Sequence, residues 1–136
     1  MRDGGVPSDS IVRLHELLTE VGDVVESDAD SVVVRVGRTR ASIRSVHLAE
    51  DLEVLSVTQL IALNLPNTPG LRDDVETHAA TLSFGSMRRS DPSGVTTDVL
   101  QYYTFPLGGL DDAGLLTVLH LVLVTGADIA ESLIGG

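Results

Sequence analysis

The chain has 136 residues and a formal net charge of −11, with 20 acidic residues against nine basic ones. This balance argues against direct binding to nucleic acid, because such binding depends on neutralising phosphates. The absence of cysteine and lysine excludes disulfides, thiol nucleophiles, thiolate metal sites and lysine Schiff bases. With 43% hydrophobic residues, we expect a single folded domain over residues 1–136, flexible at 1–8. No secretory signal is visible, so a cytoplasmic location is expected.

The first half of the chain predicts a helix followed by strands. Apolar residues at helical spacing predict a helix over residues 9–21. The acidic stretch 24–31 is expected to be a solvated turn, because it lacks the glycine and the closing glutamate of a calcium-binding loop. Alternating valines then predict a strand over 31–37, which a turn joins to a second strand over 41–48.

The segment 52–65 is too apolar for a strand with one exposed face. Its β-branched residues favour a strand, with a helix as the alternative for 57–63. A strand that is apolar on both sides is typical of a sheet covered on both faces. One layer of helices covers one face, and a second copy of the chain is one way to cover the other. Val57, Ile61 and Leu63 are therefore candidate buried or interface residues.

The second half predicts a helix over 71–80, a hairpin of strands over 81–89 and 95–107, and one long helix from 111 or 112 to 135. Either Asp111 or Asp112 can cap this last helix. It is apolar nearly all round, but its uncharged run spans only ~22 Å, short of the ~30 Å of a bilayer core. We therefore expect a core helix and no membrane. His120, in its middle, is expected to be a core histidine, with a pH-sensitive interface residue as the alternative.

Positive charge is concentrated at one place. Arg35, Arg38, Arg40 and Arg44 supply four of the nine arginines within ten residues, and no acid interrupts them. One interpretation is a solvated strand face that pairs with the protein's own acids. The other is a docking strip for an acidic partner, or for the acidic surface of a second copy.

The chain carries no recognisable catalytic motif. It has no nucleophile elbow, no glycine-rich dinucleotide loop and no Walker pattern. Its four histidines fall on four different predicted elements. We therefore predict no catalytic residue, no metal site and no cofactor.

The predicted order is helix, three strands, helix, two strands, helix. This order indicates an α+β fold with a mainly antiparallel five-stranded sheet packed against helices. Residues 99–110 place an amphipathic strand, Pro106, the pair Gly108-Gly109 and the long helix in succession. In this arrangement the chain resembles the YbjN-like family, whose fold is similar to that of type III secretion chaperones.

This resemblance implies a non-enzymatic bacterial module that is homodimeric and holds an extended segment of another protein. A small enzyme or a small-ligand-binding protein is the alternative. That alternative requires a deep pocket where polar groups converge and where pKa values are shifted.

Overall fold

The computed structural model describes residues 9–82 and 85–135. The expected flexibility of residues 1–8 concerns residues outside these ranges. The described residues form three helices and six strands. In chain order these are α1 Asp9–Leu18, β1 Asp23–Ser27, β2 Ser31–Val36, β3 Thr39–Ala49, β4 Leu52–Pro66, α2 Pro69–Thr81, β5 Ser86–Arg89, β6 Thr96–Pro106 and α3 Asp112–Gly135.

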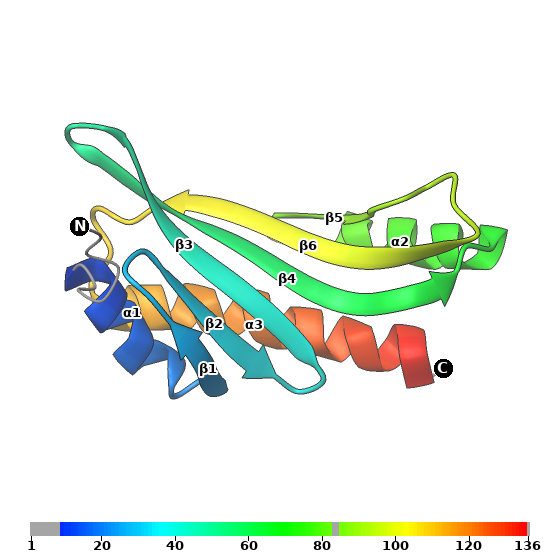
Figure 1. Cartoon of the computed structure of the whole chain (residues 1–136), viewed down its shortest axis with the longest axis horizontal. Helices are drawn as coiled ribbons and strands as arrows, with labels where there is room; N and C mark the ends of the chain where they lie inside the picture. The colour runs from blue at the N-terminus through cyan, green and yellow to red at the C-terminus, as the bar shows by residue number, and fades with distance from the viewer. Residues whose placement is uncertain (1–8, 83–84, 136) are drawn as a thin grey trace.

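The six strands form one antiparallel sheet in the order β1-β2-β3-β4-β6-β5. The three helices lie on one side of it, behind the sheet in Figure 1. No described element covers the other side, which we call the open face. The predicted α+β class, with an antiparallel sheet packed against helices, is confirmed. The sheet has one strand more than the five predicted.

The additional strand is β1 (Asp23–Ser27), so the predicted solvated turn over 24–31 is wrong for residues 24–27. Four of its five residues are exposed, so β1 lacks the alternation that reveals a half-buried strand. The turn itself is centred on Asp28. Its Oδ1 accepts from the backbone N–H groups of Asp30 and Ser31, at 3.2 and 3.1 Å, and from the Ser31 hydroxyl at 2.9 Å.

The other helices and strands begin and end closer to their predicted limits. β2, β3, β4 and β6 agree with the predicted strands to within two residues at either end, and the helical alternative for 57–63 is wrong. α1 ends at Leu18 rather than at residue 21. Thr81 belongs to α2, and β5 begins at Ser86, so the predicted strand over 81–89 is too long. Its residues 83–84 lie outside the described part of the chain.

The larger hydrophobic core lies between the sheet and the helices α1 and α3. Ile43 of β3 pairs with Val57 of β4 and therefore points the same way. Leu14 of α1, Ile43 and Leu119 of α3 are each 0% exposed. A smaller core joins α2, β5 and the C-terminal part of α3. It consists of Ile61, Leu71, Val75, Met87, Val99, Ile129 and Ala130.

A buried polar layer crosses the sheet under α3. Gln59 and Gln101 pair directly across β4 and β6 and are 0% and 1% exposed. Gln101 Nε2 donates to Gln59 Oε1 at 2.8 Å and to the Val122 carbonyl at 3.2 Å. Gln59 Nε2 donates to Thr39 Oγ1 at 2.8 Å and to the Leu123 carbonyl at 3.0 Å. Because these buried amides have partners, the layer fixes the position of α3 on the sheet.

Gly126 lets α3 approach this layer. A Cβ at position 126 would lie 2.1 Å from Gln59 Oε1. Glycine inside a helix costs about 1 kcal/mol relative to alanine. Its presence in the middle of α3 is explained by the closeness of Gln59.

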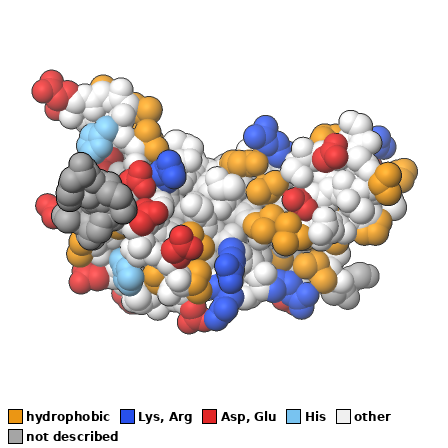
Figure 2. Space-filling view, viewed as in Figure 1, with side chains coloured by type: hydrophobic (Ala, Val, Ile, Leu, Met, Phe, Trp, Pro, Cys, Tyr) orange, Lys and Arg blue, Asp and Glu red, His pale blue; other side chains and the backbone are white. Residues whose placement is uncertain are grey.

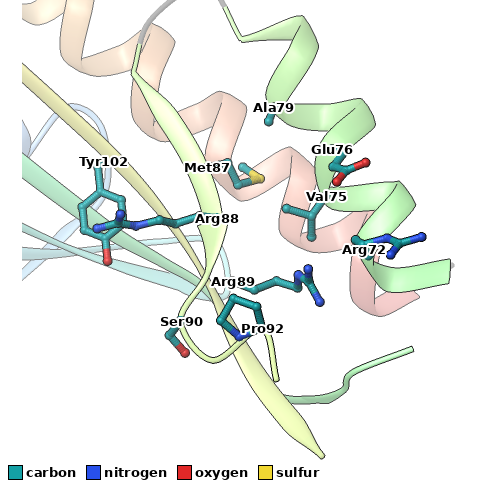
Figure 3. Close-up of a pocket in the computed structure, with 10 residues that line it drawn as sticks. All are labelled: Arg72, Val75, Glu76, Ala79, Met87, Arg88, Arg89, Ser90, Pro92 and Tyr102. Carbon is teal, nitrogen blue, oxygen red and sulfur yellow. The ribbon is translucent and has the colours of Figure 1, made fainter. Parts of the chain in front are cut away.

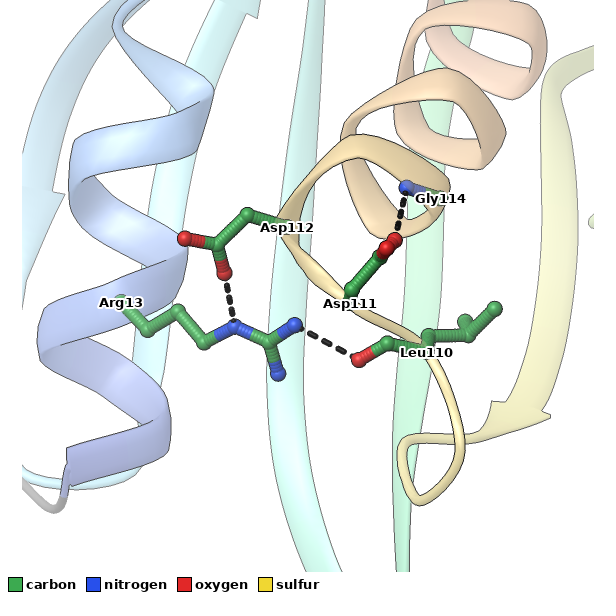
Figure 4. Close-up of polar contacts among 5 residues, drawn as sticks. All are labelled: Arg13, Leu110, Asp111, Asp112 and Gly114. Atoms are coloured by element: carbon green, nitrogen blue, oxygen red, sulfur yellow. Dashed lines mark hydrogen bonds and ion pairs between the residues drawn. The ribbon is translucent and has the colours of Figure 1, made fainter.

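The start of α3 is held by two acids, as Figure 4 shows. Asp111 Oδ1 accepts from the Gly114 backbone N–H at 2.8 Å, so Asp111 caps the helix, as one of the two predicted candidates. Asp112 pairs instead with Arg13 of α1. The Arg13 guanidinium also donates to the Leu110 carbonyl at 2.7 Å. These contacts tie α1 to the beginning of α3.

By length and composition alone, Asp112–Ile134 of α3 would suffice to cross a membrane. This is weak evidence, because the core helix of a soluble protein has the same composition. In the fold, Leu115 and Leu119 pack against the sheet, and the outer side of α3 carries exposed polar residues such as Thr117 and Asp128.

Candidate protein interface

Three of the four arginines in the predicted docking strip lie on the open face. Arg35 and Arg40 pair directly across β2 and β3, and Arg44 lies four residues further along β3, on the same side. Arg38 lies in the turn between these strands and reaches α3. Its guanidinium donates to both carboxylate oxygens of Glu131, at 2.7 and 3.3 Å. The fold therefore separates Arg38 from the other three.

These arginines also differ in how their charge is balanced. Arg35 Nη2 lies 3.2 Å from Asp23 Oδ2 of β1. Arg40 and Arg44 make no ion pair and no side-chain hydrogen bond with any described residue. Pairing with the protein's own acids therefore accounts for Arg35 and Arg38 but not for Arg40 and Arg44.

Partly buried apolar side chains lie beside these arginines. Leu60 of β4 is directly across from Arg40, and Leu100 of β6 is directly across from Leu60. Nearby on the same face, the Arg88 guanidinium lies 4.5 Å from the centre of the Tyr102 ring. Figure 2 shows basic and hydrophobic side chains next to one another on this face.

β4 is less apolar on the open face than its sequence suggested. Val57 and Ile61, two of the candidate buried or interface residues, face the helices and are each 1% exposed. On the open face, Ser56 and Thr58 occupy the middle of the strand. The open face is therefore a mixed surface of arginine, hydroxyl and partly buried apolar groups.

The other two candidates, Leu63 and His120, are exposed in the single chain. Leu63 follows an irregularity in the pairing of β4 with β6 and is 58% exposed. His120 lies on the outer side of α3, in a shallow depression that it shares with Glu20 and Leu121. The prediction of a core histidine is wrong, because a helix that is apolar nearly all round does not reveal which side packs on the sheet.

A groove of about 540 Å³ lies between β5 and α2, at one edge of the sheet. Figure 3 shows Arg89 pointing from β5 toward α2, where Arg72 lies, and Arg88 pointing away from α2 toward Tyr102. Its lining consists of Arg72, Val75, Glu76, Ala79, Met87, Arg88, Arg89, Ser90, Pro92 and Tyr102. Sequence reasoning missed this groove, because its arginines meet only once α2 packs beside β5. The adjacent pair Arg88-Arg89 was the one available signal.

Asn67 holds one end of this groove in place. Its Nδ2 donates to the carbonyls of Asp91, Pro92 and Gly94, at 3.1, 2.9 and 2.8 Å. Its Oδ1 accepts from Arg89 Nη1 at 2.7 Å. The Arg89 guanidinium is therefore oriented, while its Nε and Nη2 atoms make no hydrogen bond and no ion pair with any described residue.

The titratable side chains are scattered. Residues 9–82 and 85–135 contain no group of three side chains placed to hold a metal ion. The hydrogen bond from the Ser31 hydroxyl, with others from the same turn, lowers the pKa of Asp28. Burial raises the pKa of Tyr103 on β6, whose ring stacks on Phe105 at 5.0 Å between centroids. These two groups lie on different elements of the described chain and form no acid–base pair with each other.

No family model and no curated protein sequence matches this chain. Solved structures do share its fold. An uncharacterized protein from Methanothermobacter thermautotrophicus superimposes with a TM-score of 0.60 at 13% identity, over 91% of this chain and 96% of that one. YbjN, a candidate transcription regulator from E. coli, superimposes with a TM-score of 0.54 at 10% identity, over 93% of each chain. At these identities the likeness shows a YbjN-like fold and does not extend to partners.

Proposed function

We propose that this protein is a non-enzymatic protein-binding module. It forms a homodimer through the open face of its sheet and holds an extended segment of another protein. The observation that supports this proposal is the one-sided sheet: helices cover one face, whereas the other carries Arg40 and Arg44 without ion pairs, beside partly buried Leu60 and Leu100. Arginine and apolar side chains around a face of this kind are characteristic of protein interfaces.

The charge on the open face changes from one edge of the sheet to the other. Asp23 and Glu26 lie on β1, whereas Arg40 lies on β3 and Arg88 on β5. A two-fold axis parallel to the strands, between β3 and β4, would place β1 of one copy over β5 of its partner. The acids of each copy would then face Arg88 of the other, which makes the surface self-complementary.

The open face is large enough for such a contact. Six strands spaced ~4.8 Å apart span about 24 Å. If about 25–30 Å of the strand length takes part, each copy contributes on the order of 600–700 Å², close to the ~800 Å² per partner of a stable interface.

The mass of the protein in solution, measured by light scattering, tests the homodimer. We expect twice the chain mass of 14.4 kDa for the natural chain, and 14.4 kDa for Leu60→Asp. The variant is expected to keep its circular dichroism spectrum, because Leu60 points away from the hydrophobic cores. The matched control is Leu121→Asp, which makes the same change on the outer side of α3, where Leu121 is 49% exposed.

Three outcomes would contradict this part of the proposal. A monomeric natural chain rules out the homodimer. A dimer that survives Leu60→Asp, or one that is lost in Leu121→Asp, rules out the open face as its interface.

The proposal includes neither nucleic acid nor a membrane among the partners. YbjN is described as a candidate transcription regulator. A net charge of −11 opposes direct contact of this chain with DNA. If this chain takes part in such regulation, we propose that it acts through a bound protein.

A further inference from the structure

We infer that the groove between β5 and α2 binds an acidic, extended segment of a partner protein, which pairs with β5 as an additional strand. The inference rests on the proposed function for the class of partner, a protein. It adds the place where that partner binds and the chemistry of the bound segment.

The backbone of β5 provides the first part of the argument. β5 is the last strand of the sheet, and within the described ranges it pairs with β6 alone. Its other side therefore offers backbone N–H and C=O groups to an added strand. The four residues Ser86–Arg89 provide about 14 Å of strand for this pairing.

Helix α2 provides a wall facing this edge. Arg72, Val75, Glu76 and Ala79 lie on one side of the helix, because they are spaced three and four residues apart. Met87 points from β5 toward this wall and is 6% exposed (Figure 3). Alternate side chains of an added strand would point toward the apolar Val75, Ala79 and Met87.

The positive charge of the groove favours an acidic segment. The groove is lined by three arginines and one acid, Glu76; Arg88 points away from α2, so Arg72, Arg89 and Glu76 leave a local balance of +1 in a chain of net charge −11. Arg89 is oriented by Asn67 and has Nε and Nη2 available, a geometry suited to a carboxylate. Arg72 lies 3.7 Å from Asp73 and its side chain is 54% exposed, so it remains accessible to a ligand.

A second copy of the chain fits this groove less well than a separate segment does. The acidic strand of another copy is β1, and it would enter with the rest of its sheet and with α1, on the side where α2 already lies. Pairing of β1 with β5 would also be head-to-tail, and would continue from copy to copy into a ring or an open-ended filament. We therefore assign the groove to an extended segment of a different protein.

Fluorescence anisotropy with a short labelled peptide of the repeat Glu-Thr-Val-Thr tests the inference, because this repeat places glutamate and valine on the same side of a strand, as Met87 and Arg89 are on β5. We expect saturable binding of this peptide and none of the same peptide with lysine in place of glutamate. The glutamate peptide with alternate backbone amides N-methylated should not bind, because an added strand requires those amide groups as hydrogen-bond donors.

Two groove variants locate the site. Arg89→Gln and Arg72→Gln should each weaken binding by about tenfold, since each removes one charged contact to a carboxylate. Arg38→Gln is the matched control, because it removes an exposed arginine that lies in the turn between β2 and β3, outside both the groove and the open face; it should leave the affinity unchanged. Thermal unfolding shows whether each variant is folded. Because the Arg72 side chain is exposed, Arg72→Gln should disturb the fold less than Arg89→Gln does.

Four results would overturn the inference. Two concern the peptide: the N-methylated peptide binds as tightly as the unmodified one, or both groove variants bind the peptide as tightly as the natural chain does. The other two concern a different occupant: a single-stranded oligonucleotide binds more tightly than the peptide, or the protein forms filaments that the peptide does not block. The same titration in Leu60→Asp separates the two proposals. Peptide binding by a protein that is always monomeric contradicts the homodimer alone, whereas an intact dimer that binds no peptide contradicts the groove alone.

Discussion

The two faces of the sheet are made from alternate residues of the same strands, yet only one is completed within the chain. On β3, Ala41 and Ile43 are 1% and 0% exposed against the helices, whereas Arg40 and Arg44 are exposed on the open face. Position in the sheet does not explain this difference, because neighbouring residues share one backbone. The difference arises because the helices α1, α2 and α3 all pack on one face of the sheet. A single strand sequence thus specifies two surfaces, one filled by its own chain and one that we propose is filled by another.

The largest expected effect contrasts one leucine from each surface. Leu119→Ala should lower the free energy of unfolding by about 2–5 kcal/mol, because Leu119 is 0% exposed and its loss leaves a cavity. Leu100→Ala on the open face should cost less than about 1 kcal/mol, measured under conditions where the protein is monomeric. Urea unfolding followed by circular dichroism gives both values. Equal losses would show that the two faces do not differ as described.

A smaller effect tests the polar layer beneath the covered face. Gly126→Ala should lower the free energy of unfolding by about 1–3 kcal/mol, although alanine favours helices, because its Cβ displaces Gln59 from its hydrogen bonds. In a Gln59→Ala background the same substitution should be neutral or stabilising by up to about 1 kcal/mol. If Gly126→Ala costs the same in both backgrounds, the contact with Gln59 is not the reason for this glycine.

The smallest effect concerns the exposed turn that joins β1 to β2. Hydrogen bonds in that turn hold the pKa of Asp28 below its ordinary value of 3.8. Its contribution to stability is therefore fully present above about pH 3.8, and is lost as the pH falls through the lower folded-state pKa. Asp28→Asn should flatten the fall in unfolding free energy within that acid window. Asp30→Asn should change the curve less, because the hydrogen bonds from Asp30 N–H and from Ser31 go to the carboxylate of Asp28. Identical acid curves for the natural chain and Asp28→Asn would contradict the role of this turn.

The covered face was more predictable from the sequence than the open one. β4 and α3 are long and apolar, and Gly108-Gly109 marks the break before α3, so their limits follow from composition and turn chemistry. The sequence did not reveal β1, because an exposed edge strand that contains acidic residues has the composition of a loop. His120 was misplaced for the opposite reason, since apolar residues on every side of α3 conceal its buried side.

The candidate site was predictable only where it is local. Arg35, Arg40 and Arg44 share a face because of the hairpin that β2 and β3 form, and the alternation of side chains along a strand is enough to show this. The partner of Arg38, Glu131, lies in the last turns of α3, so packing of the helix was needed to find it. The groove beside β5 likewise depends on where α2 packs, and the buried pair of Gln59 and Gln101 depends on the pairing of β4 with β6.

Crosslinking tests the open face most directly. The chain has no cysteine, so Thr58→Cys places a single thiol in the middle of the open face, and Thr117→Cys places one on the outer side of α3. A short bismaleimide can bridge the ~10 Å between two packed sheets. We predict covalent dimers of Thr58→Cys and none of Thr117→Cys. Dimers of Thr117→Cys alone, or no covalent dimer of either variant, would contradict the open face as the surface that a second copy covers.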